Sequence, residues 1–187
     1  GRYRSGKIEH NVVYPFDNSM SVIDSIDFLS DCIHELKQAD TQGIAVGVPS
    51  IVDVNQGIVF NPVNIKSWRE VALKTLLQAR FNLPVYVNND VNCFTKGEHL
   101  LGSGMGYHNM VGLCLGTGLG AGIILQNNLY LGANCCAGEI GGVSYLDGTL
   151  DDYCSGTFFR QHFNQCGSKL AEQAYNGDKQ SLAAFEK

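Results

Sequence analysis

Hydrophobic and polar positions along the first half of the chain follow helical and strand periods in turn. Between residues 19 and 38, apolar side chains such as Ile26, Leu29 and Ile33 recur at three- and four-residue steps, which predicts an amphipathic helix capped by Asn18 or Ser19. Helices are expected at 19–38, 67–81 and 90–102, and strands at 7–14, 43–49 and 84–88. The helix at 67 is predicted from the capping-box spacing of Ser67 and Glu70. This alternation indicates an α/β sheet with crossover helices.

The second half of the chain is richer in glycine, and its pattern predicts strands joined by a glycine loop and followed by short helices. An apolar strand at 110–115 is followed by a glycine loop at 116–122, and strands at 123–126 and 129–131 form a hairpin around Asn127 and Asn128. A helix is expected over 152–166, and two short helices follow residue 168 with a break at Gly177. A boundary near residues 96–106 gives an N-terminal α/β lobe of residues 1–100 and the start of a second α/β lobe at 101–187. A cleft between two lobes is the default place for a ligand.

Composition narrows the class of protein. The 187 residues carry a net charge of −5, which argues against a surface that coats nucleic acid. No run of 18 apolar residues and no apolar signal segment is present, so we expect no membrane partner and a cytoplasmic location. The seven cysteines are odd in number and form no CxxC, which favours reduced, buried thiols. Neither the cysteines nor the five histidines show metal-ligand spacing.

The segment GTGLGAG at residues 116–122 is the first candidate site. Glycines at alternating positions expose consecutive N–H groups, and the hydroxyl of Thr117 adds a donor, so the segment suits phosphate oxygens. A glycine-rich hairpin that only permits close strand packing explains the pattern equally well. A phosphate site between two strands is typical of the actin and hexokinase type of nucleotide site.

Acidic residues at three places along the chain are the other candidates. Asp90 follows a buried-type strand among three asparagines, where it is either a helix N-cap or a ligand-binding acid at the carboxyl edge of the sheet. Glu139 stands alone in the uncharged stretch 129–146, so it is either solvated in a loop or engaged by a ligand. Asp151 and Asp152 suit a helix start.

Five motifs occur in one order between residues 43 and 156, and together they resemble the ROK family (repressors, open reading frames, kinases). They are Gly47-Val48-Pro49 with Val52-Asp53 and Gly57, Asn64-Ile65 before Trp68, Asn89-Asp90-Val91-Asn92, the glycines at 116–122, and Gly138-Glu139-Ile140-Gly141. Beyond them, Leu150-Asp151 with Tyr153 and Ser155-Gly156 is similar to the family's L-E-x-Y-x-S-G, and Ser50 stands where the family usually has Gly.

The resemblance implies an α/β fold of the actin-like ATPase (ribonuclease H-like) type, with two lobes, and transfer of a phosphoryl group from Mg²⁺-ATP to a hexose or N-acetylhexosamine. It implies that Asp90 is the catalytic base. It places the sugar against Asn89, Glu139, Asp151, Asn64 and Pro49, and the ATP phosphates against Gly116, Thr117, Gly118 and Gly120. It also implies a homodimer or a higher homo-oligomer.

Departures from the family pattern add further expectations. Gly142 replaces the usual His after G-E-I-G and the C-x-C-G-x-x-G-C run is absent, so we expect no zinc. No D-x-G-G-T loop precedes Gly43, so we expect the middle part of a longer protein, incomplete at both ends. Two other functions stay open: a sugar-responsive transcriptional regulator whose DNA-binding segment lies outside this chain, and a non-catalytic sugar-binding module.

Overall fold

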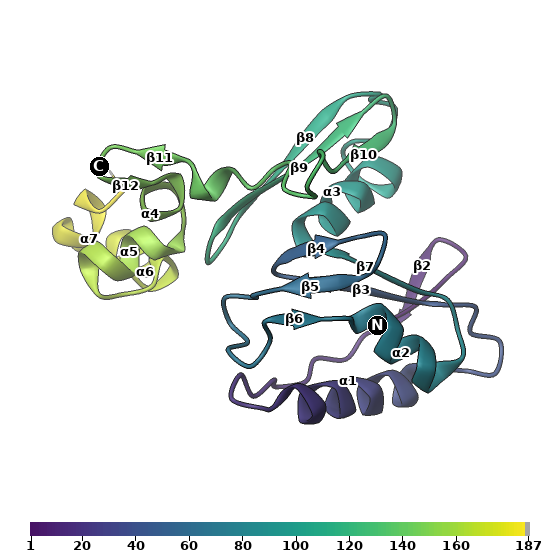
Figure 1. Ribbon diagram of the computed structural model, residues 1–187. Helices are drawn as coiled ribbons and strands as arrows, with labels where there is room; N and C mark the ends of the chain where they lie inside the picture. The colour runs from purple at the N-terminus through teal and green to yellow at the C-terminus, as the bar shows by residue number, and fades with distance from the viewer. Residues whose placement is uncertain (186–187) are drawn as a thin grey trace. The chain divides into compact units, whose positions relative to one another are not determined.

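The computed structural model describes residues 1–185. The chain forms two compact units, Gly1–Cys93 and Phe94–Lys187, and each is described by itself (Figure 1). No helix among residues 1–185 has both the length and the apolar character needed to cross a bilayer.

The first unit contains small sheets and two helices. In chain order its elements are β1 (Arg2–Arg4), β2 (Lys7–His10), α1 (Val22–Leu36), β3 (Ile44–Val48), β4 (Ile51–Asp53), β5 (Ile58–Phe60), β6 (Glu70–Val71), α2 (Leu73–Phe81) and β7 (Val85–Asn89). Strands β3 and β7 pair in parallel, β4, β5 and β6 form an antiparallel sheet, and β1 pairs with β2. Helix α3 (Asp90–Leu101) begins in this unit and continues into the second.

The core of the first unit joins both helices to the strands. Ile26 of α1, Leu73 and Leu77 of α2 and Val85 of β7 are almost fully buried in one apolar cluster. Trp68 belongs to the same cluster, and its indole N–H donates to the Ser25 hydroxyl at 2.8 Å. A buried indole needs such an acceptor, so Trp68 is a core residue and not a platform for a sugar ring.

The structure corrects two predicted helix starts in the first unit. Helix α1 begins at Val22, and its N-cap is Ser21, whose hydroxyl accepts from the Asp24 amide, in place of Asn18 or Ser19. The capping-box prediction at Ser67 was wrong. Glu70 pairs with Phe60 in the β5–β6 ladder, so the backbone that the pattern assigned to a first helical turn is extended, and α2 begins only at Leu73.

The second unit combines one three-stranded sheet with short helices. Its elements after α3 are β8 (Met110–Leu115), β9 (Leu119–Leu125), β10 (Asn128–Tyr130), the 3₁₀ helix η1 (Ile140–Gly142), β11 (Ser144–Tyr145), β12 (Gly148–Thr149), α4 (Leu150–Cys154), α5 (Gly156–Phe163), α6 (Gly167–Tyr175) and α7 (Lys179–Ala183). Strands β8, β9 and β10 form an antiparallel meander.

Glycines let α3 approach the meander closely. Gly112 and Gly122 face each other across β8 and β9, and a Cβ on either would overlap the fully buried Thr95 of α3. Glycine at positions 112 and 122 therefore leaves the space on the meander that Thr95 of α3 fills.

Three predictions for the second unit are corrected in detail. The glycine loop is shorter than expected, because β9 already begins at Leu119. The hairpin turn lies at Gln126 and Asn127, which have positive φ, one residue earlier than predicted. The helix expected over 152–166 is two helices, because Ser155 is extended and caps α5 through its side chain. The break at Gly177 is confirmed, with φ of 92°.

Candidate functional site

The carboxyl ends of β3 and β7 bring two predicted site segments together. Parallel pairing sets Val48 opposite Asn89, so Pro49 and Ser50 leave β3 where Asp90 leaves β7. A Cβ on Gly47 would lie 3.4 Å from the Asp90 Cα, so the backbones are close at this edge. Ligands of α/β proteins bind at such carboxyl edges.

Asparagines order this edge through their amides. Asn89 is at the N-cap position of α3, where its Oδ1 accepts from the Asn92 N–H at 3.0 Å, and its Nδ2 donates to the Ser50 carbonyl at 3.2 Å. The Asn88 Oδ1 accepts from the Asn89 N–H at 2.8 Å and from the Asn92 Nδ2 at 3.3 Å. These bonds fix Asn89 while leaving it a second Nδ2 hydrogen for a ligand.

Asp90 is thereby released from capping. Its Oδ1 accepts from the Val91 N–H at 2.9 Å, the side chain is exposed, and none of the hydrogen bonds within residues 1–185 reaches its Oδ2. The alternative that Asp90 is the N-cap of α3 was wrong, because Asn89 fills that role. Burial raises the pKa of the nearby Cys93 thiol, and the negative charge of Asp90 raises it further, so this thiol stays protonated beside the carboxylate.

Asn64 lies apart from these contacts. It is exposed in the segment between β5 and β6, and no hydrogen bond in the described part of the chain joins it to Pro49, Asn89 or Asp90. Its contact with a sugar stays a prediction.

In the second unit, the predicted phosphate residues form the tip of the β8–β9 hairpin. Residues 116–118, called the hairpin loop below, are exposed, and the Gly116 N–H donates to the Gly118 carbonyl at 3.0 Å. A Cβ on Gly116 would meet no atom within 4 Å, so this side of the loop has room for a ligand. Gly120 lies in β9 itself, paired with Cys114.

Glu139 is positioned by the glycines on either side of it. Gly138 has φ of 95°, its carbonyl accepts from the Ala121 N–H at 2.9 Å, and a Cβ there would overlap the Ala121 carbonyl oxygen. A Cβ on Gly141 would likewise overlap the carbonyl oxygen of Leu119. Both glycines therefore hold η1 against the backbone of β9, with the exposed Glu139 between them.

Asp151 contacts the hairpin and not an open surface. Its Oδ1 accepts from the N–H of Leu119, the first residue of β9. Next to it, Asp152 closes a capping box with Thr149, and the Thr149 hydroxyl holds the pKa of this carboxyl below its usual value. The box fixes the first turn of α4, which carries Asp151.

The segment where the family pattern has its cysteine run is a short hairpin of β11 and β12. The Tyr153 hydroxyl donates to the Asp147 carboxylate, and the ring of Tyr153 packs edge-on against Tyr145 at 5.3 Å between centroids. The hydrogen bond lowers the pKa of Asp147 and raises that of Tyr153. Within residues 1–185, no three His, Cys, Asp or Glu side chains are grouped to hold a metal ion. The expected burial of the thiols was wrong, because each of the seven cysteines is partly or fully exposed.

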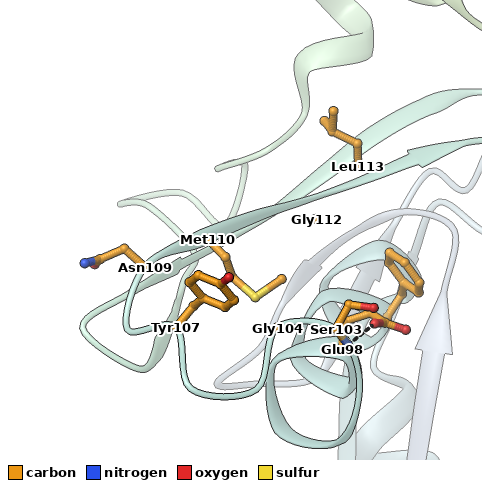
Figure 2. Close-up of a pocket in the computed structure, with 9 residues that line it drawn as sticks. Glu98, Ser103, Gly104, Tyr107, Asn109, Met110, Gly112 and Leu113 are labelled. Atoms are coloured by element: carbon orange, nitrogen blue, oxygen red, sulfur yellow. Dashed lines mark hydrogen bonds between the residues drawn. The ribbon is translucent and has the colours of Figure 1, made fainter.

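The second unit contains a cavity of about 360 Å³ (Figure 2). Glu98 at its edge accepts from the Ser103 N–H at 2.9 Å. The predicted site residues do not line it; its lining is Phe94, Glu98, Ser103, Gly104, Tyr107, Asn109, Met110, Gly112 and Leu113.

The predicted motifs contain most of the residues that make these contacts, but Thr157 lies outside them, and no partner was predicted for Ser50, Asn88, Asn92 or Ser155. Ser50, Asn88 and Asn92 hold Asn89, and Ser155 with Thr157 contacts the hairpin loop. The unusual Ser50 and the S-G of the last motif were the available signals, but neither says which atoms meet.

Comparison with solved structures identifies the fold. A ROK family glucokinase from Streptomyces griseus, solved with glucose and AMPPNP, matches with a TM-score of 0.73 and 25% identity over 88% of this chain and 64% of that one. A ROK hexokinase from Thermus thermophilus matches with a TM-score of 0.76. The α/β fold is therefore that of the actin-like ATPase sugar kinases, as expected.

Sequence comparison gives the family. The ROK family model matches residues 4–186, and the chain belongs to this family. A xylose repressor from Bacillus spizizenii is 31% identical over 166 residues, covering 86% of this chain and 40% of its own length. A glucokinase from Halalkalibacterium halodurans is 39% identical over 113 residues, covering 60% of this chain and 34% of its own length. The chain thus spans well under half the length of these curated relatives.

Proposed function

We propose that this chain forms part of an ATP-dependent sugar kinase, which phosphorylates a hydroxyl of a hexose or an N-acetylhexosamine. Asp90 is the general base in this proposal. The sugar contacts Asn89, Glu139, Pro49 and Asn64, and the ATP phosphates contact the hairpin loop and Gly120.

The observation that carries the proposal is the division of roles between Asn89 and Asp90. Asn89 caps α3, so the exposed carboxylate of Asp90 keeps one oxygen that no donor in residues 1–185 occupies. A sugar hydroxyl is a weak nucleophile, and a carboxylate within hydrogen-bond reach takes its proton as the bond to phosphorus forms. The adjacent amide of Asn89 has a donor left to orient that hydroxyl.

ATP fits the second unit through backbone groups. The exposed hairpin loop offers N–H groups beside the open space at Gly116, which suits phosphate oxygens. The Streptomyces griseus relative was solved with an ATP analogue, which supports the same nucleotide here. Mg²⁺ in this proposal arrives on the ATP phosphates. A homo-oligomer in the cytoplasm remains our prediction for the assembly and its location.

A regulator is the second candidate, because xylose repressors are about as similar to this chain as glucokinases are. In that case the same edge of β3 and β7 binds a sugar without transfer, and sugar binding changes affinity for DNA through a segment outside this chain.

The test is turnover by the intact protein with ATP and a panel of hexoses and N-acetylhexosamines. Asp90→Asn is expected to lower kcat by at least about 100-fold, the usual contribution of a general base, with sugar affinity within about tenfold. The exposed Asp31 of α1 gives the matched control, since Asp31→Asn makes the same charge change away from the site. Turnover retained in Asp90→Asn rejects the base. No turnover in the wild type, with sugar-dependent DNA binding, favours the regulator.

A further inference from the structure

The hairpin loop is held by the junction of α4 and α5, residues 151–157. The Gly156 N–H donates to the Gly116 carbonyl at 2.8 Å, and the Thr157 hydroxyl donates to the Thr117 carbonyl at 2.9 Å. The Ser155 hydroxyl lies 3.1 Å from the same Thr117 carbonyl and 2.7 Å from the Asp151 carbonyl, so its single proton is shared between them. With the bond from the Leu119 N–H to Asp151, the junction contacts three successive peptides at the tip.

These contacts decide where the amides of the loop point. All peptide bonds of the described chain are trans, so the carbonyl of one residue and the N–H of the next point in opposite directions. Because the Gly116 and Thr117 carbonyls face the junction, the N–H groups of Thr117 and Gly118 face away from it. Neither N–H donates to another group within residues 1–185. Two successive free N–H groups form the kind of nest that binds an anion.

The carboxylate of Asp151 is confined behind this nest. A Cβ on Gly118 would lie 3.1 Å from the Asp151 Oδ1, and a Cβ on Gly141 would lie 3.2 Å from it. The side chain therefore fills the space between the hairpin loop and η1. Turning Oδ1 toward another ligand would break its bond to Leu119 and leave that N–H without an acceptor.

We propose that Asp151 is a positioning residue for the phosphate-binding loop, which it orients through Leu119, and that it is not a ligand of the sugar. Thr157 and Ser155 orient the same loop through the Thr117 carbonyl. The inference rests on the proposed function, because the phosphate bound by the loop is that of ATP.

Two substitutions separate the acceptor of Asp151 from its charge. Asp151→Asn keeps an oxygen that accepts from Leu119 and removes a negative charge near the phosphates, so affinity for a non-hydrolysable ATP analogue should stay within twofold or improve. Asp151→Ala removes the acceptor, so affinity for the analogue should fall at least fivefold. Thr157→Val removes one donor at the Thr117 carbonyl, so affinity for the analogue should fall two- to fivefold. This variant tests the inference if Asp151→Ala does not fold.

The experiment is calorimetric titration of the intact protein with the ATP analogue and, separately, with glucose and N-acetylglucosamine. Hydrogen exchange of the Leu119 amide is measured on the same variants. We expect sugar affinity within twofold of wild type in each variant and faster exchange of Leu119 in Asp151→Ala only. Glu172→Ala, an exposed acid on α6, is the control that should change nothing.

The outcomes are distinct. Loss of sugar affinity in Asp151→Ala with unchanged analogue affinity makes Asp151 a sugar ligand and overturns the inference. Unchanged Leu119 exchange in Asp151→Ala overturns it as well, whatever the protein binds. A wild type that binds no ATP analogue contradicts the proposed kinase, and the exchange of Leu119 still decides whether Asp151 holds the loop.

Discussion

Gly112→Ala tests whether glycine is required for α3 to sit on the meander. The added Cβ would lie 3.0 Å from both the Cβ and the Cγ2 of Thr95 and still closer to its Oγ1, and Thr95 is fully buried. Unstrained carbon contacts begin near 3.5 Å, so α3 or β8 must move. Overpacking of this kind costs about 1–3 kcal/mol. For a chain of this size, about 2 kcal/mol lowers Tm by roughly 4–8 °C.

The double variant Gly112→Ala/Thr95→Ala assigns the loss to this contact. Thr95→Ala removes the hydroxyl and the methyl group that clash and leaves a Cβ–Cβ distance of 3.0 Å, which a shift of a few tenths of an ångström relieves. At least half of the lost stability should therefore return relative to Thr95→Ala alone. Neighbouring residues show such coupling in double-mutant cycles.

Gly97→Ala is the matched control, because Gly97 lies in the same helix and its Cβ would meet nothing within 4 Å. It should stabilise the protein by about 0.5–1 kcal/mol, since alanine is the better helix former. The assay is urea unfolding followed by circular dichroism. Equal stabilities of Gly112→Ala and Gly97→Ala would refute the idea that glycine is required at position 112 to make room for Thr95. Additive losses in the double variant would refute it as well.

Three further substitutions test the site region. Gly138→Ala should cost at least about 2 kcal/mol in urea unfolding, because φ is 95° and the new Cβ would lie 2.8 Å from the Ala121 carbonyl carbon, whereas Gly142→Ala, with open space around it, should cost little. Gly118→Val should displace Asp151 and so lower affinity for the ATP analogue at least tenfold. An affinity equal to that of the wild type in calorimetric titration contradicts this. The capping box lowers the pKa of Asp152, so it stabilises the fold above about pH 4, and this is lost as pH falls through the folded-state pKa. The stability difference between wild type and Thr149→Ala should therefore shrink below pH 4. A difference that is constant from pH 2 to 7 would exclude a stabilising role for the charged Asp152 in the capping box.

The longer elements of the fold could be predicted from the sequence, α1 from its helical period and strands such as β3 from a continuous apolar run between turn residues. Helices α1 and α3 and strands β3, β7 and β8 were expected within a few residues of their observed bounds. Strands β4, β5 and β6 have two or three residues each, too few for alternation to show. At Ser67 the local helix signal lost to pairing with β5, a contact that no neighbouring residue encodes.

For the candidate site too, the sequence could predict some features and not others. The motif spacing predicted that Asp90 lies at a sheet edge, because it follows a buried strand directly. It could not predict that Ser50 accepts from Asn89, or that Thr157 donates to Thr117, since these bonds join residues 39 and 40 positions apart. Backbone carbonyls accept both bonds, and any residue type supplies a carbonyl, so the sequence carries no signal for the partner.

The two candidate functions differ in what they require of the two units. A kinase and a sugar-responsive regulator both need the sugar edge around Asn89, so similarity there cannot separate them. Only the kinase needs a loop whose amides are turned toward a phosphate. In this chain four hydrogen bonds join the α4–α5 junction to residues 116–119, three donated by the junction and one donated by the Leu119 N–H. The phosphate-binding loop is therefore the feature on which the two functions differ, and affinity for the ATP analogue is the measurement that best separates them.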